Sequence, residues 1–306
     1  MIYKVLDKIK KSIAHILANT VFKEKIDSKN NYLNIMSDTN LVDEIVNNNK
    51  SFARFGDGEL SLILNKNFNI SFQENSEELN KKLIEVLNSD LKNLIIGINR
   101  SFNDPSIYNK KVERYFRTFN FLNREKYKKI IPKDKVYGNS SITRFYIDYD
   151  KKNLSEAYKR LNNLRRIWNK RKLLIVEGKH TRLGVGNDLF DNSKSIRRII
   201  VPEKNAFNSF DEIIDTVKKH IKKDEMVLLA VGPTATVLTY ELAKNDIQAV
   251  DVGHIDIEYE WLKMKTDKRV AVKGKYVNEI KGDKYTESEF EDESYNKSIV
   301  SVIENK

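Results

Sequence analysis

The stretch MVLLAVGPTATVLTYELAKNDIQAVDV, residues 226–252, determines the fold class of this chain. Its apolar run 226–231 predicts a buried strand, and Gly232-Pro233 ends that strand. Residues 234–244 predict a helix, and the apolar run 247–252 predicts a second strand. A strand, a helix and a strand in this order place the two strands as parallel neighbours, so the stretch predicts a βαβ unit of an α/β domain.

Apolar runs and helical patterns alternate in the same way outward from this unit. Further strands are predicted just before Gly56, at 94–98, within 135–147, at 173–176 and at 196–201, and helices near 39–49, 60–64, 76–90, 154–170 and 206–222. Apolar strands separated by helices are typical of a parallel sheet that is covered on both faces. We therefore predict an α/β fold, a Rossmann-like mostly parallel sheet flanked by helices, with a single principal domain over residues 35–265.

The two ends of the chain differ from this domain. Residues 1–34 predict an amphipathic helix and a connection, and Ile2, Val5, Ile9, Ile13 and Leu17 share one face of that helix. The helix could rest on a membrane surface, or dock on its own domain or on the second subunit of a homodimer. Residues 266–306 are polar, and acidic residues crowd positions 283–293, which predicts a solvated tail or appendage with little chemistry.

The composition excludes several classes of protein. The chain has 306 residues and no cysteine, so disulfides, zinc-thiolate sites and cysteine nucleophiles are excluded, and a reducing, cytoplasmic compartment is favoured. No apolar run is long enough to span a bilayer, so we expect a soluble protein or one at the inner face of the membrane. Lys and Arg total 55 against 44 Asp and Glu, a net charge of +11 that favours anionic partners.

A first candidate site lies in the sequence RFGDGE, residues 54–59, at the end of a predicted strand. Asp57 and Glu59 could jointly hold a hard divalent cation, and Gly56 lets the backbone approach a ligand closely. Arg54 could neutralise a phosphate beside that cation. The structural alternative makes Asp57 a helix N-cap with Glu59 in the first turn, which would explain both acids without a ligand.

Two further candidates follow other strands of the predicted sheet. A glycine-rich basic loop after 173–176 could present backbone N–H groups, Lys179 and Arg182 to a diphosphate, although a plain surface loop has the same composition. Gly232, the residue after the strand 226–231, and the helix cap Thr234 could receive a phosphate or ribose hydroxyl, although ordinary capping is the preferred local explanation. The candidate donor contacts in these two places are Glu177, Lys179, Arg182, Gly184, Gly186, Asn187, Asp188, Gly232 and Thr234.

A fourth candidate is HIDIEYEW, residues 254–261, which alternates polar and apolar residues. As a strand it would place His254, Asp256, Glu258 and Glu260 on one face, where like charges raise the carboxyl pKa values toward those of a general base. As a helix it would make His254 and Glu258 an ordinary pair one turn apart. Asp256 is the first choice for a base, with Glu258 and His254 behind it.

Five stretches together resemble the bacterial GT-D type of glycosyltransferase domain. They are RFGDGE, YGNSSITRFYI, LLIVEGKHTRLGVGNDLFDNSKSIRRIIVPEKNAF, LLAVGPTATVLTYELA and VDVGHIDIEYEW, in this order, within residues 35–265. The resemblance implies a nucleotide-sugar donor and a DxE motif, here Asp57 and Glu59, that holds a divalent metal, Mn²⁺ or Mg²⁺, against the diphosphate. Arg144, in the second stretch, becomes a further candidate donor contact.

The resemblance therefore implies a metal-dependent glycosyltransferase that moves a sugar from a nucleotide diphosphate sugar, such as a UDP-sugar, to a glycan acceptor hydroxyl. If the reaction inverts configuration, the acceptor needs a base. If it retains configuration, residues 254–258 would only orient sugar hydroxyls. The alternatives are another nucleotide- or sugar-phosphate enzyme on the same fold and a nucleic-acid-binding protein. No nucleic-acid-binding motif is present, so no nucleic-acid partner is expected.

Overall fold

The computed structural model describes residues 2–22, 33–150, 154–280 and 292–304, of which residues 2–8 are described as backbone only. One sheet of nine strands forms the centre of the molecule, in the order β1-β4-β3-β2-β8-β7-β5-β6-β9. Every neighbouring pair in it is parallel. The strands are β1 (Asn34–Ile35), β2 (Ser51–Phe55), β3 (Leu94–Ile98), β4 (Val136–Asn139), β5 (Lys172–Gly178), β6 (Ser195–Val201), β7 (Glu225–Ala230), β8 (Ala249–Asp251) and β9 (Ile299–Val302).

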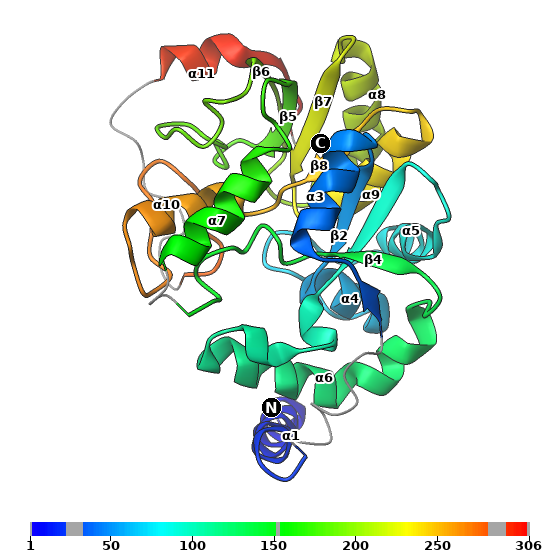
Figure 1. Cartoon of the computed structure of the whole chain (residues 1–306). Coiled ribbons are helices and arrows are strands. Elements are labelled where there is room, and N and C mark those ends of the chain that lie inside the picture. The colour runs from blue at the N-terminus through cyan, green and yellow to red at the C-terminus, as the bar shows by residue number, and fades with distance from the viewer. Residues whose placement is uncertain (1, 23–32, 151–153, 281–291, 305–306) are drawn as a thin grey trace.

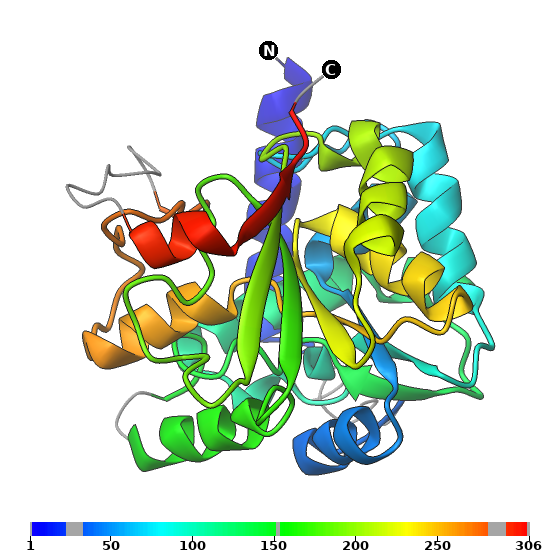
Figure 2. The same ribbon diagram turned by 90° about the horizontal axis from the view of Figure 1, so that it is seen from above.

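Helices cover both faces of this sheet (Figure 1). The α-helices are α1 (Ile2–Asn19), α3 (Asp38–Asn47), α4 (Asp57–Leu64), α5 (Glu77–Asn88), α6 (Lys110–Ile130), α7 (Leu154–Arg165), α8 (Phe210–His220), α9 (Pro233–Lys244), α10 (Ile255–Lys263) and α11 (Glu293–Ser298). Helices α3, α7 and α10 pack on one face, and α4, α5, α8 and α9 on the other (Figure 2). The predicted α/β class and the parallel sheet flanked by helices are confirmed.

The strands are apolar because both of their faces are buried. Successive residues of β5 show this directly, since Leu173 and Ile175 enter one apolar cluster while Leu174 and Val176 enter the other. At the centre of the sheet, β2 lies between β3 and β8. The chain runs from β2 through β3 to β4 on one side and then crosses to β5 on the other. Such a reversal of strand order opens a crevice at the carboxyl ends of the strands, where open α/β sheets bind ligands.

Residues 255–261 are helical, so the preferred prediction of a strand over 254–261 was wrong. Residues 255–263 form α10, and His254 directly precedes it. A strand would place four ionisable side chains on one face, whereas a helix distributes them. Asp256 and Glu260 remain one turn apart, and Lys275 lies between their carboxylates and compensates their charge. The alternation of polar and apolar residues therefore belongs to a helix that is buried on most of its sides, and not to a strand.

The ends of the chain also differ from what the sequence predicted. Helix α1 packs on α6 through Ala14 and Ala18, while Ile13, expected on the docking face, is 53% exposed. Strand β9 extends the sheet beyond β6, so the last described residues belong to the domain and are not a detached appendage. Within the described residues, no helix is both long and apolar enough to cross a bilayer.

Candidate active site

A cleft of about 1210 Å³ runs along the carboxyl ends of the strands. It crosses β3, β2, β8, β7, β5 and β6 at the residues that follow each strand, and α6 and the segment 267–279 close its other side. Its lining includes Arg54, Gly56, Asp57, Glu59, Asn99, Tyr115, Ser140, Ser141, Arg144, Asp148, Gly232, Asp251, His254, Asp256, Arg269, Asn278 and Glu279. Helices α4, α9 and α10 all begin at this edge, so three helix N-termini contribute positive potential to it.

Two carboxylates, those of Asp57 and Glu59, stand at the start of α4 and face the cleft. Gly56 is the N-cap, and Glu59 accepts a 2.8 Å hydrogen bond from the Gly56 N–H. Asp57 is the first helical residue and not the N-cap of the structural alternative, and its Oδ2 accepts a 2.5 Å hydrogen bond from the Tyr115 hydroxyl. The structural alternative is therefore correct for Glu59, whose carboxylate accepts from a backbone N–H at the start of the helix.

The electrostatics of this pair fit a bound cation. Burial, with the Asp251 carboxylate as a further cause, raises the pKa of Glu59 to about 7. A cation beside Glu59 would compensate this unfavourable buried charge, and carboxylate oxygens are the ligands that Mg²⁺ and Mn²⁺ prefer. No cluster of three or more His, Asp or Glu able to hold a metal exists among the described residues. The remaining ligands would therefore come from a bound diphosphate and water.

Arg54 lines the cleft, but its guanidinium is engaged within the protein. It forms a 2.9 Å ion pair with Asp251 and donates to the Ser140 carbonyl at 3.1 Å and to Thr143 Oγ1 at 2.7 Å. Gly253 has a φ of +48°, and a Cβ there would lie 1.9 Å from Arg54 Nη2, so only glycine fits beside this pair. Arg54 thus joins the ends of β2, β4 and β8, instead of presenting a free charge to a phosphate as the sequence suggested.

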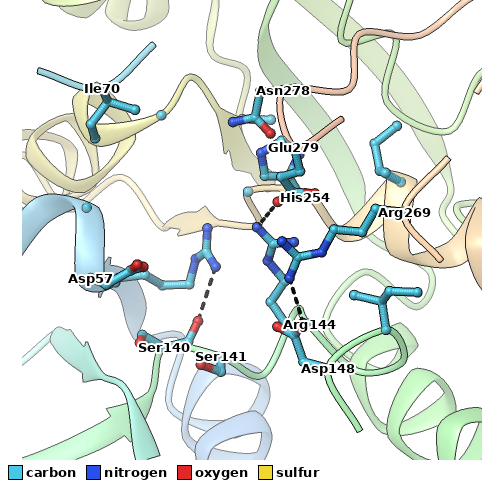
Figure 3. A pocket seen from close by; sticks show the side chains of 18 of the residues that line it. Asp57, Ile70, Ser140, Ser141, Arg144, Asp148, His254, Arg269, Asn278 and Glu279 are labelled. Carbon is cyan, nitrogen blue, oxygen red and sulfur yellow. Dashed lines mark hydrogen bonds and ion pairs between the residues drawn. The ribbon is translucent and has the colours of Figure 1, made fainter. Parts of the chain in front are cut away.

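The opposite side of the cleft carries two arginines (Figure 3). Arg144 forms an ion pair with Glu279 and lies 3.5 Å from Glu258, and Arg269 lies 2.9 Å from Asp148. The Nη1 atom of Arg144 is buried, and it is the atom that lies 3.5 Å from Glu258 Oε1. Asp57 and Arg144 lie on different sides of the cleft in this view, so a ligand between them would meet a carboxylate on one side and a guanidinium on the other.

The two carboxylates proposed first as a base are held by the protein. Asp256 Oδ1 accepts from the Gly184 N–H and from Asn187 Nδ2, and its Oδ2 pairs with Lys275. Glu258 is fully buried, and its Oε2 accepts from two backbone N–H groups, those of residues 146 and 147. Asp256 orders the loop at 184–187, and Glu258 orders the loop that carries Arg144. Both carboxylates therefore have structural partners in this arrangement.

His254, like Asp256, lines the cleft, where it lies beside Glu279 (Figure 3). Burial lowers the pKa of its imidazole to about 4, and the guanidinium groups of Arg144, Arg54 and Arg269 act in the same direction against the opposing effect of Glu279. The ring is therefore neutral at neutral pH and can accept a hydrogen bond. It is suited to orienting a sugar hydroxyl more than to removing a full proton.

The lowered pKa of His254 predicts a specific acid sensitivity of the fold. As pH falls from 6.5 to about 4, the unfolded chain takes up a proton at His254 that the folded chain refuses, so the free energy of unfolding decreases over that interval. We expect urea unfolding of His254→Gln to lose this part of the pH dependence. The stability of the wild type relative to the variant should then decline from neutral pH to about pH 4.5. Parallel pH profiles for the two proteins would contradict the assignment.

The glycine-rich loop after β5 reaches the cleft through Gly178, Thr181 and Leu183, whereas the predicted contacts Lys179, Arg182, Gly184 and Gly186 are not among the lining residues. Arg182 packs its guanidinium 5.1 Å from the centre of the Tyr295 ring, and Glu177 is buried, where it pairs with Arg198 and accepts from the Leu183 N–H. Lys179, Gly186 and Asp188 are exposed at the surface, outside the residues that line the cleft. Gly184 and Asn187 hold Asp256, as described above. This loop therefore acts mainly as a support for α10.

The two candidate donor contacts at the start of α9, Gly232 and Thr234, lie in different surroundings. Gly232 lines the cleft with a φ of +59°, and a Cβ there would lie 2.3 Å from the Phe72 ring, so the turn requires glycine. Thr234 is buried and lies 3.4 Å from Gln73 Oε1, away from the cleft lining. The glycine remains a candidate donor contact, whereas the threonine is part of the packing between α9 and residue 73.

Several cleft residues were missed from the sequence. Tyr115 lies on α6, a helix whose apolar residues repeat at helical spacing over 110–130 and which that periodicity could have revealed. Arg269, Asn278 and Glu279 line the cleft and Lys275 pairs with Asp256, although all four lie beyond residue 265, where little chemistry was predicted. No motif in 266–280 indicates that these residues lie at the cleft, because their position depends on contacts with residues such as Asp256 and Arg144.

Comparisons with known proteins agree with this architecture. A model of the glycosyltransferase GT-D fold family matches residues 52–280. Glycosyltransferase GlyD of Streptococcus pneumoniae serotype 4 is 33% identical over 290 residues, which is 94% of this chain and 35% of that protein. The probable glycosyl transferase Gly of Streptococcus gordonii is 33% identical over 272 residues, 89% of this chain and 39% of that protein. The chain thus spans less than half the length of these curated relatives.

Solved structures show the same relationship. One, described as a domain of unknown function 1792 with a distinct glycosyltransferase fold, has a TM-score of 0.82 and 33% identity over 89% of this chain and 96% of its own. Another, described as a new glycosyltransferase from Streptococcus sanguinis, has a TM-score of 0.81 and 31% identity over 89% of this chain and 100% of its own. The chain belongs to the glycosyltransferase GT-D fold family, which confirms the resemblance seen in the sequence.

Proposed function

We propose that this domain transfers a sugar from a nucleotide diphosphate sugar, such as a UDP-sugar, to a hydroxyl of a glycan acceptor, with the help of a divalent cation. The observation that carries the proposal is the pair Asp57 and Glu59 on one side of a cleft whose other side holds Arg144. A diphosphate leaving group needs its developing charge stabilised, and this arrangement offers a metal site and a guanidinium for that purpose.

Asp57 and Glu59 would hold Mn²⁺ or Mg²⁺, which when bound supplies charge stabilisation to the leaving diphosphate. Arg144, whose side chain lines the cleft, would bind the same diphosphate with its guanidinium, while Glu279 and Glu258 keep that guanidinium in place. The backbone at Gly232 and the starts of α9 and α10 would add hydrogen-bond donors and positive potential. Because Asp256 and Glu258 are held by the protein, His254 becomes our candidate for contact with a sugar hydroxyl.

A panel of nucleotide sugars tests this proposal. Each sugar is incubated with the protein, with Mn²⁺ or with excess chelator, and the released nucleotide diphosphate is measured. We expect one donor class to be hydrolysed slowly without acceptor and transferred faster when a glycan acceptor is present, in both cases only with the metal. Release at the same rate in chelator would contradict the metal-dependent part, and no release from any donor would contradict the donor class.

We also propose a peripheral contact of α1 with the inner face of the cell membrane. Ile9, Ile13 and Ile16 of α1 are 49%, 53% and 61% exposed and are spaced to share one face, and Lys10 beside them is exposed. Apolar side chains that insert shallowly and lysines that meet anionic lipid are the two contributions that bind such helices to a bilayer. A cytoplasmic enzyme would in this way be held near a lipid-linked acceptor.

Binding to vesicles containing anionic lipid should therefore occur and weaken with salt. Replacing Ile13→Asp together with Ile16→Asp should weaken it by about tenfold or more, because both side chains then lose their burial in the lipid. Transfer to a short soluble acceptor should be unchanged. If vesicle binding stays the same and sedimentation shows a dimer converted to a monomer, the face serves a homodimer and the membrane contact is wrong.

A further inference from the structure

One contact of the proposed metal site comes from α6, a helix that does not follow a strand of the sheet directly. The Tyr115 hydroxyl donates to Asp57 Oδ2 at 2.5 Å across 58 residues of sequence. Helices α4, α9 and α10 reach the cleft because each follows a strand of the sheet directly. Helix α6 follows the short 3₁₀ turn η2 (Pro105–Ile107) instead, yet it still places one side chain on an acid of the DxE motif.

Packing of the ring aims this hydroxyl at Asp57. The Tyr115 ring is stacked on Phe119 with centroids 6.1 Å apart and meets Phe116 edge-on at 5.2 Å. The helix is itself anchored, since Asn120 Nδ2 donates to the Ser101 carbonyl at 2.7 Å and Thr118 Oγ1 lies 2.8 Å from His15 Nδ1 of α1. The position of the phenol is therefore set by contacts that do not involve Asp57.

Stability of the fold does not require this hydrogen bond. Tyr115 is 49% exposed, and Asp57 faces the cleft, so both groups could bond to water instead. A hydrogen bond between partly exposed groups contributes little to folding. Its effect on Asp57 is more specific, because a donor on one carboxylate oxygen fixes the rotation of the group and leaves the other oxygen for a ligand.

We propose that Tyr115 is a positioning residue for the divalent cation: its hydroxyl holds the Asp57 carboxylate in the orientation in which it binds the metal. This inference rests on the proposed function, since it assumes that Asp57 and Glu59 hold the cation. Groups that hydrogen-bond to metal ligands in this way commonly change metal affinity by about 10- to 100-fold when they are removed.

The test is the affinity for Mn²⁺, measured by electron paramagnetic resonance of the free ion during titration of the full chain. Tyr115→Phe keeps the ring and its packing and removes only the hydroxyl. We expect its Kd for Mn²⁺ to rise by about tenfold, and its transfer rate to fall at low Mn²⁺ and recover at saturating Mn²⁺. Tyr158→Phe, an exposed tyrosine on α7, is the matched control and should bind as the wild type does.

Asp57→Asn in the same titration separates this inference from the proposed function. If the wild type binds no Mn²⁺, or if Asp57→Asn binds it as tightly as the wild type, the proposed metal site is wrong. If Asp57→Asn loses binding while Tyr115→Phe binds like the wild type, the metal site stands and the positioning role is overturned. A transfer rate of Tyr115→Phe that stays low at saturating Mn²⁺ overturns it as well.

Discussion

Replacing Asp57→Asn is expected to lower the rate of sugar transfer by about 100-fold or more, the range seen when a group that stabilises transition-state charge is removed. The amide keeps the size of the side chain and can still accept from Tyr115, but it lacks the charge that holds a divalent cation. Glu59→Gln should show a loss of the same kind. The rate is measured as nucleotide diphosphate released in the presence of acceptor and Mn²⁺.

A matched control uses an acid that lies away from the cleft. Asp215 is exposed on α8 and does not line the cleft, so Asp215→Asn should transfer at the wild-type rate. Circular dichroism and the urea midpoint should show all three variants folded. An Asp57→Asn variant that is folded and retains full activity, with or without chelator, would remove Asp57 from the metal site.

Replacing Arg54→Met should destabilise the protein by about 3–5 kcal/mol, the cost of leaving one member of a buried ion pair without its partner. Asp251 is nearly fully buried, and Arg54 also donates to the loop after β4. The methionine fills a similar volume but leaves the Asp251 carboxylate, at the end of β8, without its partner. The free energy of unfolding is measured by urea titration at neutral pH.

A second variant checks whether the unpaired charge is the cause. The double variant Arg54→Met with Asp251→Asn removes both charges, so it should be more stable than Arg54→Met alone. If Arg54→Met costs less than about 1 kcal/mol, the range of an exposed pair, then Arg54 does not hold the strand ends together. In that case its guanidinium would be available to a phosphate, as the sequence alone suggested.

The parallel sheet could be predicted from the sequence because its signal is local. Most strands from β2 to β8 contain a short apolar run bounded by glycine, proline or polar residues, and that pattern exists before any tertiary contact forms. Residues 254–261 misled the prediction because their alternation fits a strand as well as a helix buried on most sides. Lys275 compensates the charge of Asp256 on the helix, and nothing in the local sequence connects these two residues.

The candidate site was predictable only in part for the same reason. Asp57 and Glu59 could be found because both lie in one short motif after a strand. The surroundings of Arg54 and Arg182 could not be predicted, because each has a distant partner: Asp251 lies 197 residues from Arg54, and Tyr295 packs on Arg182. Tyr115 and Glu279 reach the cleft from a helix and from a segment that carry no motif. Charged residues in a sequence show what chemistry is available, whereas their partners determine which of them face the ligand.

Anomalous diffraction at the manganese absorption edge, from crystals grown with Mn²⁺ and a nucleoside diphosphate, tests the metal site most directly. We predict one strong peak between the carboxylates of Asp57 and Glu59, with the diphosphate bound to the same ion and extending toward Arg144. A peak elsewhere in the cleft, or a nucleoside diphosphate bound with no metal at these two carboxylates, would contradict the account.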